Sequence, residues 1–215
     1  MYIDFHTHNI IADSSVFSIL SYSAKESISN TDLPMTLGLH PWDIVHCDIE
    51  NSFRYIENML QCENILMIGE CGLDKCKNIP MSIQEALFER HILLSEKYCK
   101  PLVIHCVKAF AELVAIKKKH RPTQRLIVHG FANNINIANM LLAEGIVLSF
   151  GKNLFNPRGN AIKVLPLVSD MSFFLETDDD DISIKDIYAK AAEIVGWEIN
   201  KLQQLQKCML KEILN

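Results

Sequence analysis

Eight short apolar segments alternate with longer stretches of helical periodicity, and this alternation restricts the fold more than any other feature of the chain. The apolar segments are rich in Val, Ile, Leu and aromatic residues, which favour β-strands. They cover residues 2–5, 16–22, 35–39, 65–68, 102–104, 126–128, 146–150 and 172–175. Strands that alternate with helices are usually parallel and joined by crossover connections. Eight such units predict an α/β protein of the (β/α)8 TIM-barrel type.

The helical segments carry recognisable start and stop signals. Apolar residues recur along 49–60 at spacings of three and four, which gives one stripe. Ser82 to Glu85 has the form of a capping box and predicts a helix that runs to Tyr98. Further helices are expected over 109–120, from a cap at Asn133 or Asn134 to residue 144, and over 184–214 with a break near Gly196.

The first two connections are short. About ten residues separate the first strand from the second, which is marginal for a crossover that contains a helix. The connection after the second strand is also short. We therefore expect a barrel shortened in its first two β/α units, and an open doubly wound sheet is the alternative.

Length and composition indicate one ordinary globular domain over residues 1–215. The chain is 49% hydrophobic and 22% charged, and it has no apolar run long enough to span a membrane. No secretory signal is recognisable at the N-terminus. The seven cysteines are odd in number and form no Cys-x-x-Cys pair, so reduced thiols in a cytoplasmic protein are expected. Nothing indicates an obligatory protein partner.

The net charge of −5 argues against binding nucleic acid through a broad positive surface. It leaves open an enzyme that holds a phosphate locally through metal ions.

Ionisable residues follow the predicted strands. His6 and His8 come directly after the first strand, and side chains two residues apart on an extended chain point the same way. In a parallel barrel the carboxyl ends of all the strands meet at one face, where active sites are built. Five further candidates stand at or just beyond the ends of later strands: His40, Glu70, His105, His129 and Asp178.

This set of side chains suits a metal centre. Imidazoles combined with carboxylates favour Zn²⁺, Mn²⁺, Fe²⁺ or Ni²⁺ over Ca²⁺, which prefers oxygen ligands. The ligands are too many for one tetrahedral zinc. Two metal ions that share Glu70 accommodate them, and paired metals suit hydrolysis because they activate water and polarise a phosphoryl or carbonyl oxygen.

Six segments occur in the order typical of one family: DFHTH (4–8), GLHPW (38–42), IGECGLD (68–74), VIHC (103–106), VHGF (128–131) and LETD (175–178). Together they resemble the signature motifs of the TatD family of metal-dependent deoxyribonucleases and related hydrolases, within the amidohydrolase superfamily. The resemblance spans nearly the whole chain.

The resemblance implies a role for each of these residues. His6 and His8 would bind one metal, His105 and His129 the second, and Glu70 both. Asp178 would bind a metal and orient or deprotonate the attacking water, and His40 would contact the substrate phosphate or a water. Asp74 and Glu176 would hold imidazoles in place. The expected catalytic residues are Asp178, Glu70 and His40, the metals are two divalent ions (Zn²⁺, Mn²⁺, Ni²⁺ or Mg²⁺), and the expected substrate contacts are His40, Lys108 and Phe131.

The chain departs from the family pattern at two places. Where relatives carry Arg after the histidine of the fifth strand, this chain has Val107, with Lys108 as the nearest cation. Lys cannot reproduce the planar fork of Arg. Relatives carry Ser or Ala and then Pro after LETD, whereas this chain has three aspartates at 179–181. Their negative charge would repel a polyanion.

Three functions are compatible with the sequence. The first is a two-metal phosphodiesterase that acts from the 3′ end of single-stranded DNA. The second keeps the metals and hydrolyses a small-molecule lactone, amide or ester. The third is a metal-binding or scaffold protein without catalysis.

Overall fold

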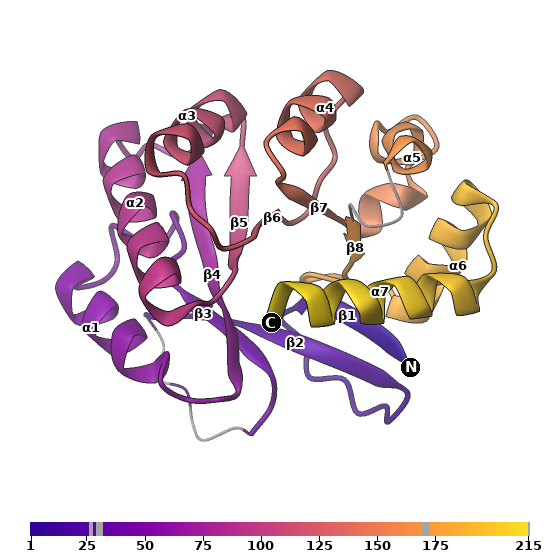
Figure 1. Cartoon of the computed structure of the whole chain (residues 1–215), viewed down its shortest axis with the longest axis horizontal. Helices are drawn as coiled ribbons and strands as arrows, with labels where there is room; N and C mark the ends of the chain where they lie inside the picture. The colour runs from indigo at the N-terminus through magenta and orange to yellow at the C-terminus, as the bar shows by residue number, and fades with distance from the viewer. Residues whose placement is uncertain (26–27, 29–31, 169–172, 215) are drawn as a thin grey trace. The chain divides into compact units, whose positions relative to one another are not determined.

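The computed structural model describes residues 1–25, 28, 32–168 and 173–214 (Figure 1). In this part of the chain the strands are β1 (Tyr2–Thr7), β2 (Val16–Ser23), β3 (Met35–Gly38), β4 (Ile65–Asp74), β5 (Leu102–Val107), β6 (Leu126–Val128), β7 (Val147–Phe150) and β8 (Phe173–Leu175). The helices are α1 (Ile49–Met59), α2 (Met81–Tyr98), α3 (Phe110–His120), α4 (Ile135–Ala143), α5 (Ala161–Val164), α6 (Ile184–Val195) and α7 (Ile199–Leu214), with short 3-10 helices η1 (Lys152–Phe155) and η2 (Leu165–Leu167).

The order of the strands in the sheet follows the chain, from β1 to β8. The pairs β1–β2, β3–β4, β4–β5 and β7–β8 are parallel. Thr7 at the end of β1 also forms a parallel bridge with Asp178, just beyond β8, so the first strand meets the last. An open doubly wound sheet lacks this closure. The predicted (β/α)8 barrel is therefore confirmed.

The chain divides into two compact units. The terminal unit comprises Met1–Leu20 and Val128–Asn215, and the central unit comprises Ser21–Ile127. The boundaries fall within β2 and next to the last residue of β6.

In the terminal unit, helices α6 and α7 pack on β1 and β8 (Figure 1). The buried Tyr188 hydroxyl of α6 donates to the Ile3 carbonyl oxygen and accepts from the Ile3 N–H, both at 3.1 Å. Gln206 of α7 is also buried, and its amide bonds the backbones of Phe173 and Leu175 at 3.0 and 3.1 Å. These contacts fix the two strands whose ends carry candidate ligands.

In the central unit, β4 is longer than predicted, because it continues past residue 68 to Asp74. The glycines Gly69 and Gly72 account for the difference. A Cβ on either would overlap a carbonyl oxygen of β5, that of Val103 or His105. Glycine weakens a strand on propensity alone, but here it allows β4 and β5 to approach closely.

Most of the helix signals are confirmed. Asn134 caps α4 by accepting from the N–H groups of Asn136 and Ile137, and Gly196 ends α6 with a φ of 69°. The capping box at Ser82 is wrong. Helix α2 begins at Met81 with Pro80 as its N-cap and without a side-chain cap bond, so Ser82 lies inside the first turn.

The first two β/α units are shortened, as predicted. No helix occurs among the described residues between β1 and β2 or between β2 and β3. Ser172, the predicted start of the last strand, lies outside the described residues. Helix α5 and the two 3-10 helices were not predicted, because three or four residues are too few to show a periodicity. No helix in the described part of the chain is long and apolar enough to cross a membrane.

His91 of α2 is buried and ties this helix to the segment that carries His40. Its Nε2 accepts from the Leu39 N–H at 3.1 Å, and its Nδ1 lies 2.8 Å from the Leu87 carbonyl oxygen. Both contacts together require the neutral ring with its proton on Nδ1. Burial lowers the pKa of His91 from 6.5 to about 4, and the charge of Arg90 acts in the same direction.

This lowered pKa predicts an acid-sensitive contribution to stability. The unfolded chain takes up the His91 proton as the pH falls below 6.5, whereas the folded chain resists it until about 4. The free energy of unfolding should fall by about 2 kcal/mol between roughly pH 7 and pH 5 through this group alone. In His91→Leu that part of the pH dependence should vanish, although the lost Leu39 bond lowers stability at every pH. Urea unfolding of both proteins at the two pH values measures the difference, and equal pH slopes would contradict the assignment.

Candidate functional site

The end of β1 and the segment after β8 bring three candidate ligands of the terminal unit together. The His8 N–H donates to the Asp178 carbonyl oxygen, and the Asp178 N–H donates to the His6 carbonyl oxygen, both at 2.9 Å. This exchange fixes the Asp178 backbone, with a φ of 59°, beside the two histidines. We call His6, His8 and Asp178 the terminal cluster.

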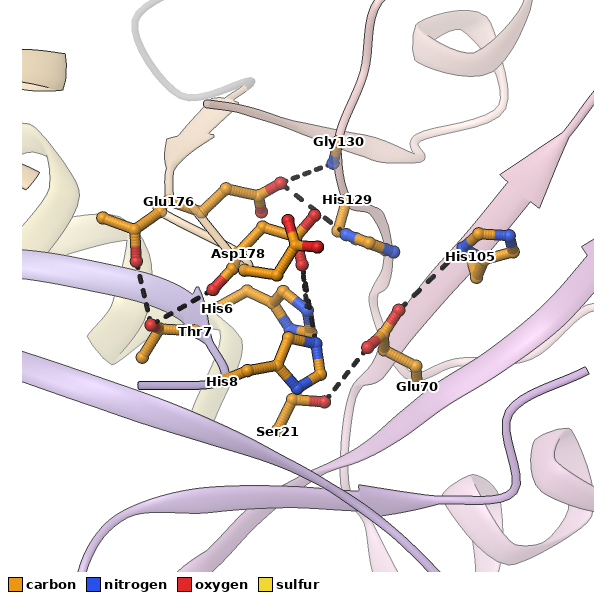
Figure 2. Close-up of polar contacts among 12 residues, drawn as sticks. His6, Thr7, His8, Ser21, Glu70, His105, His129, Gly130, Glu176 and Asp178 are labelled. Atoms are coloured by element: carbon orange, nitrogen blue, oxygen red, sulfur yellow. Dashed lines mark hydrogen bonds and ion pairs between the residues drawn. The ribbon is translucent and has the colours of Figure 1, made fainter. Parts of the chain in front are cut away.

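The side chains of the terminal cluster converge on one carboxylate oxygen (Figure 2). The Nε2 atoms of His6 and His8 lie 3.6 and 3.5 Å from Asp178 Oδ1. His6 is fully buried, whereas the His8 side chain is 41% exposed. Burial alone would raise the pKa of Asp178, but the neighbouring His6 and His8 imidazoles hold it well below its usual range. The carboxylate is therefore ionised, as a metal ligand must be.

His129 lies beside this cluster in the same unit. Its ring centroid is 4.5 Å from that of His6, and its Nδ1 is 3.7 Å from Glu176 Oε1. The Gly130 N–H donates to the same Glu176 oxygen at 2.5 Å, which anchors the carboxylate (Figure 2). With Nδ1 turned toward Glu176, Nε2 is the nitrogen of His129 that suits a metal.

Asp4 and Thr177 support the terminal cluster and were not predicted as site residues. Asp4 accepts from the Thr177 N–H at 2.9 Å and from the Thr177 hydroxyl at 2.7 Å. The Thr177 and Thr7 hydroxyls lie 2.9 Å apart. Burial raises the pKa of Asp4 to about 7. The sequence feature that could have indicated Asp4 is its position: a carboxylate inside an apolar strand, two residues before His6.

Three candidate site residues of the central unit form a second group, which we call the central cluster: His40, Glu70 and His105. Glu70 is buried, and its Oε2 lies 3.6 Å from His40 Nε2 and 3.9 Å from His105 Nδ1. The Ser21 hydroxyl donates to Glu70 Oε1 at 3.2 Å (Figure 2). The ring centroids of the two histidines are 4.5 Å apart.

Asp74 orients His105. Its Oδ2 lies 3.3 Å from His105 Nε2 and accepts from the Trp42 indole N–H at 2.7 Å. Burial alone would raise the pKa of Asp74, but hydrogen bonds from Trp42, Cys76 and His105 keep it below the usual value. An ionised Asp74 calls for a proton on His105 Nε2, which leaves Nδ1, the nitrogen that faces Glu70, as the ligand atom.

Gln84 of α2 forms hydrogen bonds with the backbone of Asp74. It is fully buried, its Oε1 accepts from the Asp74 N–H at 2.7 Å, and its Nε2 donates to the carbonyl oxygens of Asp74 and Ile79 at 3.1 and 2.9 Å. Neither Gln84 nor the indole N–H of Trp42 was predicted to take part, because the contacts depend on how α2 and the segment after β3 pack on the end of β4.

The donor atoms of each cluster fit a divalent metal ion. Within each cluster, one ligand atom from every residue lies within 4.8 Å of the others. Two ligands bound to one ion at about 2.1 Å are roughly 3.0–3.4 Å apart. The nitrogen–oxygen separations found in the two clusters are slightly longer, at 3.5, 3.6 and 3.9 Å. Imidazoles with ionised carboxylates match the preference of Zn²⁺ and similar ions.

The remaining predicted site residues differ in their surroundings. Lys108 is exposed and follows β5 with a φ of 55°. Phe131 is buried, and its ring centroid lies 5.7 Å from that of Phe150, so packing accounts for its position. Contact of either residue with substrate stays a prediction. In the acidic run, Asp179 and Asp180 lie 3.4 and 2.8 Å from Lys152 Nζ, which offsets part of their charge.

A (β/α)8 fold with imidazole–carboxylate clusters at its strand ends defines a candidate metal-binding barrel protein. Residues 6–214 match the family model described as "TatD related DNase". The chain belongs to the TatD family, as the resemblance of its motifs predicted.

Two curated relatives illustrate the similarity. The chain is 30% identical over 161 residues to the "3'-5' ssDNA/RNA exonuclease TatD" of Edwardsiella piscicida, a match that covers 72% of this chain and 61% of that one. It is 28% identical over 156 residues to the "Uncharacterized metal-dependent hydrolase YjjV" of Escherichia coli K12, covering 69% and 58%. The matched part is thus about three fifths of the length of these relatives.

Solved structures share the fold. The crystal structure of the TatD homologue YjjV from Escherichia coli K12 has a TM-score of 0.86 at 19% identity, covering 99% of this chain and 97% of that one. A hydrolase of the TatD family from Entamoeba histolytica has a TM-score of 0.77 at 16% identity, with 97% of both chains covered.

Proposed function

We propose that this chain is a metal-dependent phosphodiesterase that removes nucleotides from the 3′ end of single-stranded DNA. The observation that carries the proposal is the pair of imidazole–carboxylate clusters, each with its ligand atoms close together. Membership of the TatD family supports it, as does the similarity to a relative named as a 3′-5′ exonuclease.

Two divalent ions would be held by six residues: His6, His8, Glu70, His105, His129 and Asp178. Glu70 is the proposed shared ligand, on the basis of the family pattern. When bound, such ions supply Lewis-acid activation of water and offset the negative charge that develops on the phosphoryl oxygen. The candidate ions are Zn²⁺, Mn²⁺, Ni²⁺ and Mg²⁺.

The protein groups have separate tasks in this scheme. Asp178, kept ionised by His6 and His8, accepts a hydrogen bond from the attacking water and orients it. His40 donates to the substrate phosphate, and Lys108 contributes a positive charge near the end of β5. Asp74 and Glu176 hold the rings of His105 and His129, which keeps the donor nitrogens in place.

An end-labelled oligonucleotide tests the proposal. Protein loaded with Mn²⁺ or Zn²⁺ should shorten single-stranded DNA stepwise from the 3′ end, and excess chelator should abolish the shortening. A substrate blocked at its 3′ end should resist, whereas one blocked at its 5′ end should be degraded. Metal-loaded protein that leaves these substrates and simple phosphodiesters intact would refute the proposal. Activity on lactones, amides or esters would then identify the second class of hydrolase, and failure to bind metal would indicate a protein without catalysis.

A further inference from the structure

A lysine stands beside the central cluster, three residues after the end of β4. Lys77 Nζ lies 3.7 Å from the centroid of the Trp42 ring, a cation–π contact. The Lys77 N–H points to the Asp74 carbonyl oxygen at 3.4 Å, within the turn that follows the strand. The turn and the indole together restrict where this ammonium group lies.

Within the part of the chain that the structure describes, no carboxylate offsets the positive charge of Lys77. Among the described residues it makes no ion pair, whereas Lys75, two positions earlier, pairs with Glu112 at 2.6 Å. An aromatic face attracts a cation but carries no net charge, so it leaves the ammonium able to attract an anion. Lys77 is also exposed to solvent.

Trp42 links Lys77 to the groups that act in the site. Its indole N–H donates to Asp74, and its ring centroid lies 5.0 and 5.4 Å from those of His40 and His105. Trp42 is 45% exposed, and Lys77 lies over its ring. Its structural role is to hold the ammonium beside the central cluster.

We propose that Lys77 is a phosphate-binding residue of this enzyme and supplies the positive charge absent at Val107. This inference rests on the proposed function, because the phosphate belongs to the single-stranded substrate. It assigns to Trp42 the task of positioning Lys77. A lysine binds phosphate as a point charge, so the contact favours affinity over sequence preference.

Binding and cleavage are measured separately in Lys77→Met, Lys77→Arg and the matched control Lys75→Met. Fluorescence anisotropy with a labelled single-stranded oligonucleotide, blocked at its 3′ end so that it resists cleavage, gives the Kd of the metal-loaded protein over a range of salt concentrations. Lys77→Met should raise the Kd roughly five- to tenfold and reduce the slope of log Kd against log salt by about 0.7, because one phosphate contact is lost. Lys77→Arg should stay close to the wild type, and so should Lys75→Met. Circular dichroism checks the fold of each variant.

The outcomes separate the two proposals. An unchanged Kd and salt slope in Lys77→Met would overturn the assignment of Lys77, even if the wild-type protein degrades DNA. Equal losses of affinity in Lys77→Met and Lys75→Met would also overturn it, because they would indicate an effect of overall charge and not of one contact. If the wild type fails to cleave DNA, the proposed function fails, while a selective loss of binding in Lys77→Met still supports Lys77 as an anion-binding residue.

Discussion

Replacing Asp178 with asparagine should lower kcat of the metal-loaded protein by at least about a thousandfold. The amide keeps the shape of the side chain but removes the charge, so it neither balances a cation nor accepts strongly from the attacking water. The backbone bonds between Asp178 and the two histidines do not involve the side chain, so the fold should be retained. Single-turnover cleavage of an end-labelled oligonucleotide measures the rate.

The neighbouring Asp179→Asn is the matched control. Its carboxylate is exposed, and its nearest cation is Lys152 at 3.4 Å, so its kcat should stay within about threefold of the wild type, as expected for a surface substitution. A comparable loss of kcat in both variants would show that the total negative charge of this segment, and not Asp178 alone, determines the rate. An active Asp178→Asn protein would remove Asp178 from the proposed mechanism.

Replacing Glu70 with glutamine should weaken metal binding by at least about a hundredfold at both positions. Glutamine still accepts from the Ser21 hydroxyl through its amide oxygen, so the change removes charge with little loss of packing. If Glu70 is shared by both ions, the amount of tightly bound metal per chain should fall below one, and cleavage should be lost. Equilibrium dialysis followed by elemental analysis gives the stoichiometry.

Glu112→Gln serves as the control for Glu70→Gln. Glu112 is paired with Lys75 in the same unit, and its replacement should leave metal content unchanged. Retention of one tightly bound ion in Glu70→Gln would argue that Glu70 serves a single metal. Retention of two would exclude Glu70 as a ligand.

The strand order was predictable because it depends on local signals. Each strand is a short apolar run. The length of each connection indicates whether it can contain a helix. The extent of β4 was not predictable, since Gly69 and Gly72 oppose strand formation until the close approach of β5 is known. The start of α2 was missed for a related reason. Pro80 and Ser82 both suit a helix N-terminus, and the pattern does not decide between them.

The candidate ligands were predictable from their positions at strand ends, and the resemblance to the family also indicated Asp74 and Glu176 as groups that orient them. The contacts of Trp42 and Gln84 with Asp74 were not predictable. Nothing in the spacing of Asp74 and Trp42 shows that the indole N–H and a ring nitrogen of His105 meet the same carboxylate oxygen. The same holds for Lys77, whose significance depends on its contact with a ring 35 positions earlier. Such contacts follow from side-chain rotamers and helix packing, which sequence periodicity does not encode.

The two clusters differ in how far apart their residues lie along the chain. All three residues of the central cluster come from the continuous segment Ser21–Ile127, whereas the terminal cluster joins His6 and His8 to Asp178. During synthesis from the N-terminus, the residues of the central cluster are therefore available before the segment from Val128 onward has been made. The terminal ligands remain incomplete until the last strand has been added. Metal uptake on the ribosome should accordingly begin at the central cluster, and the second ion should enter only as the barrel closes.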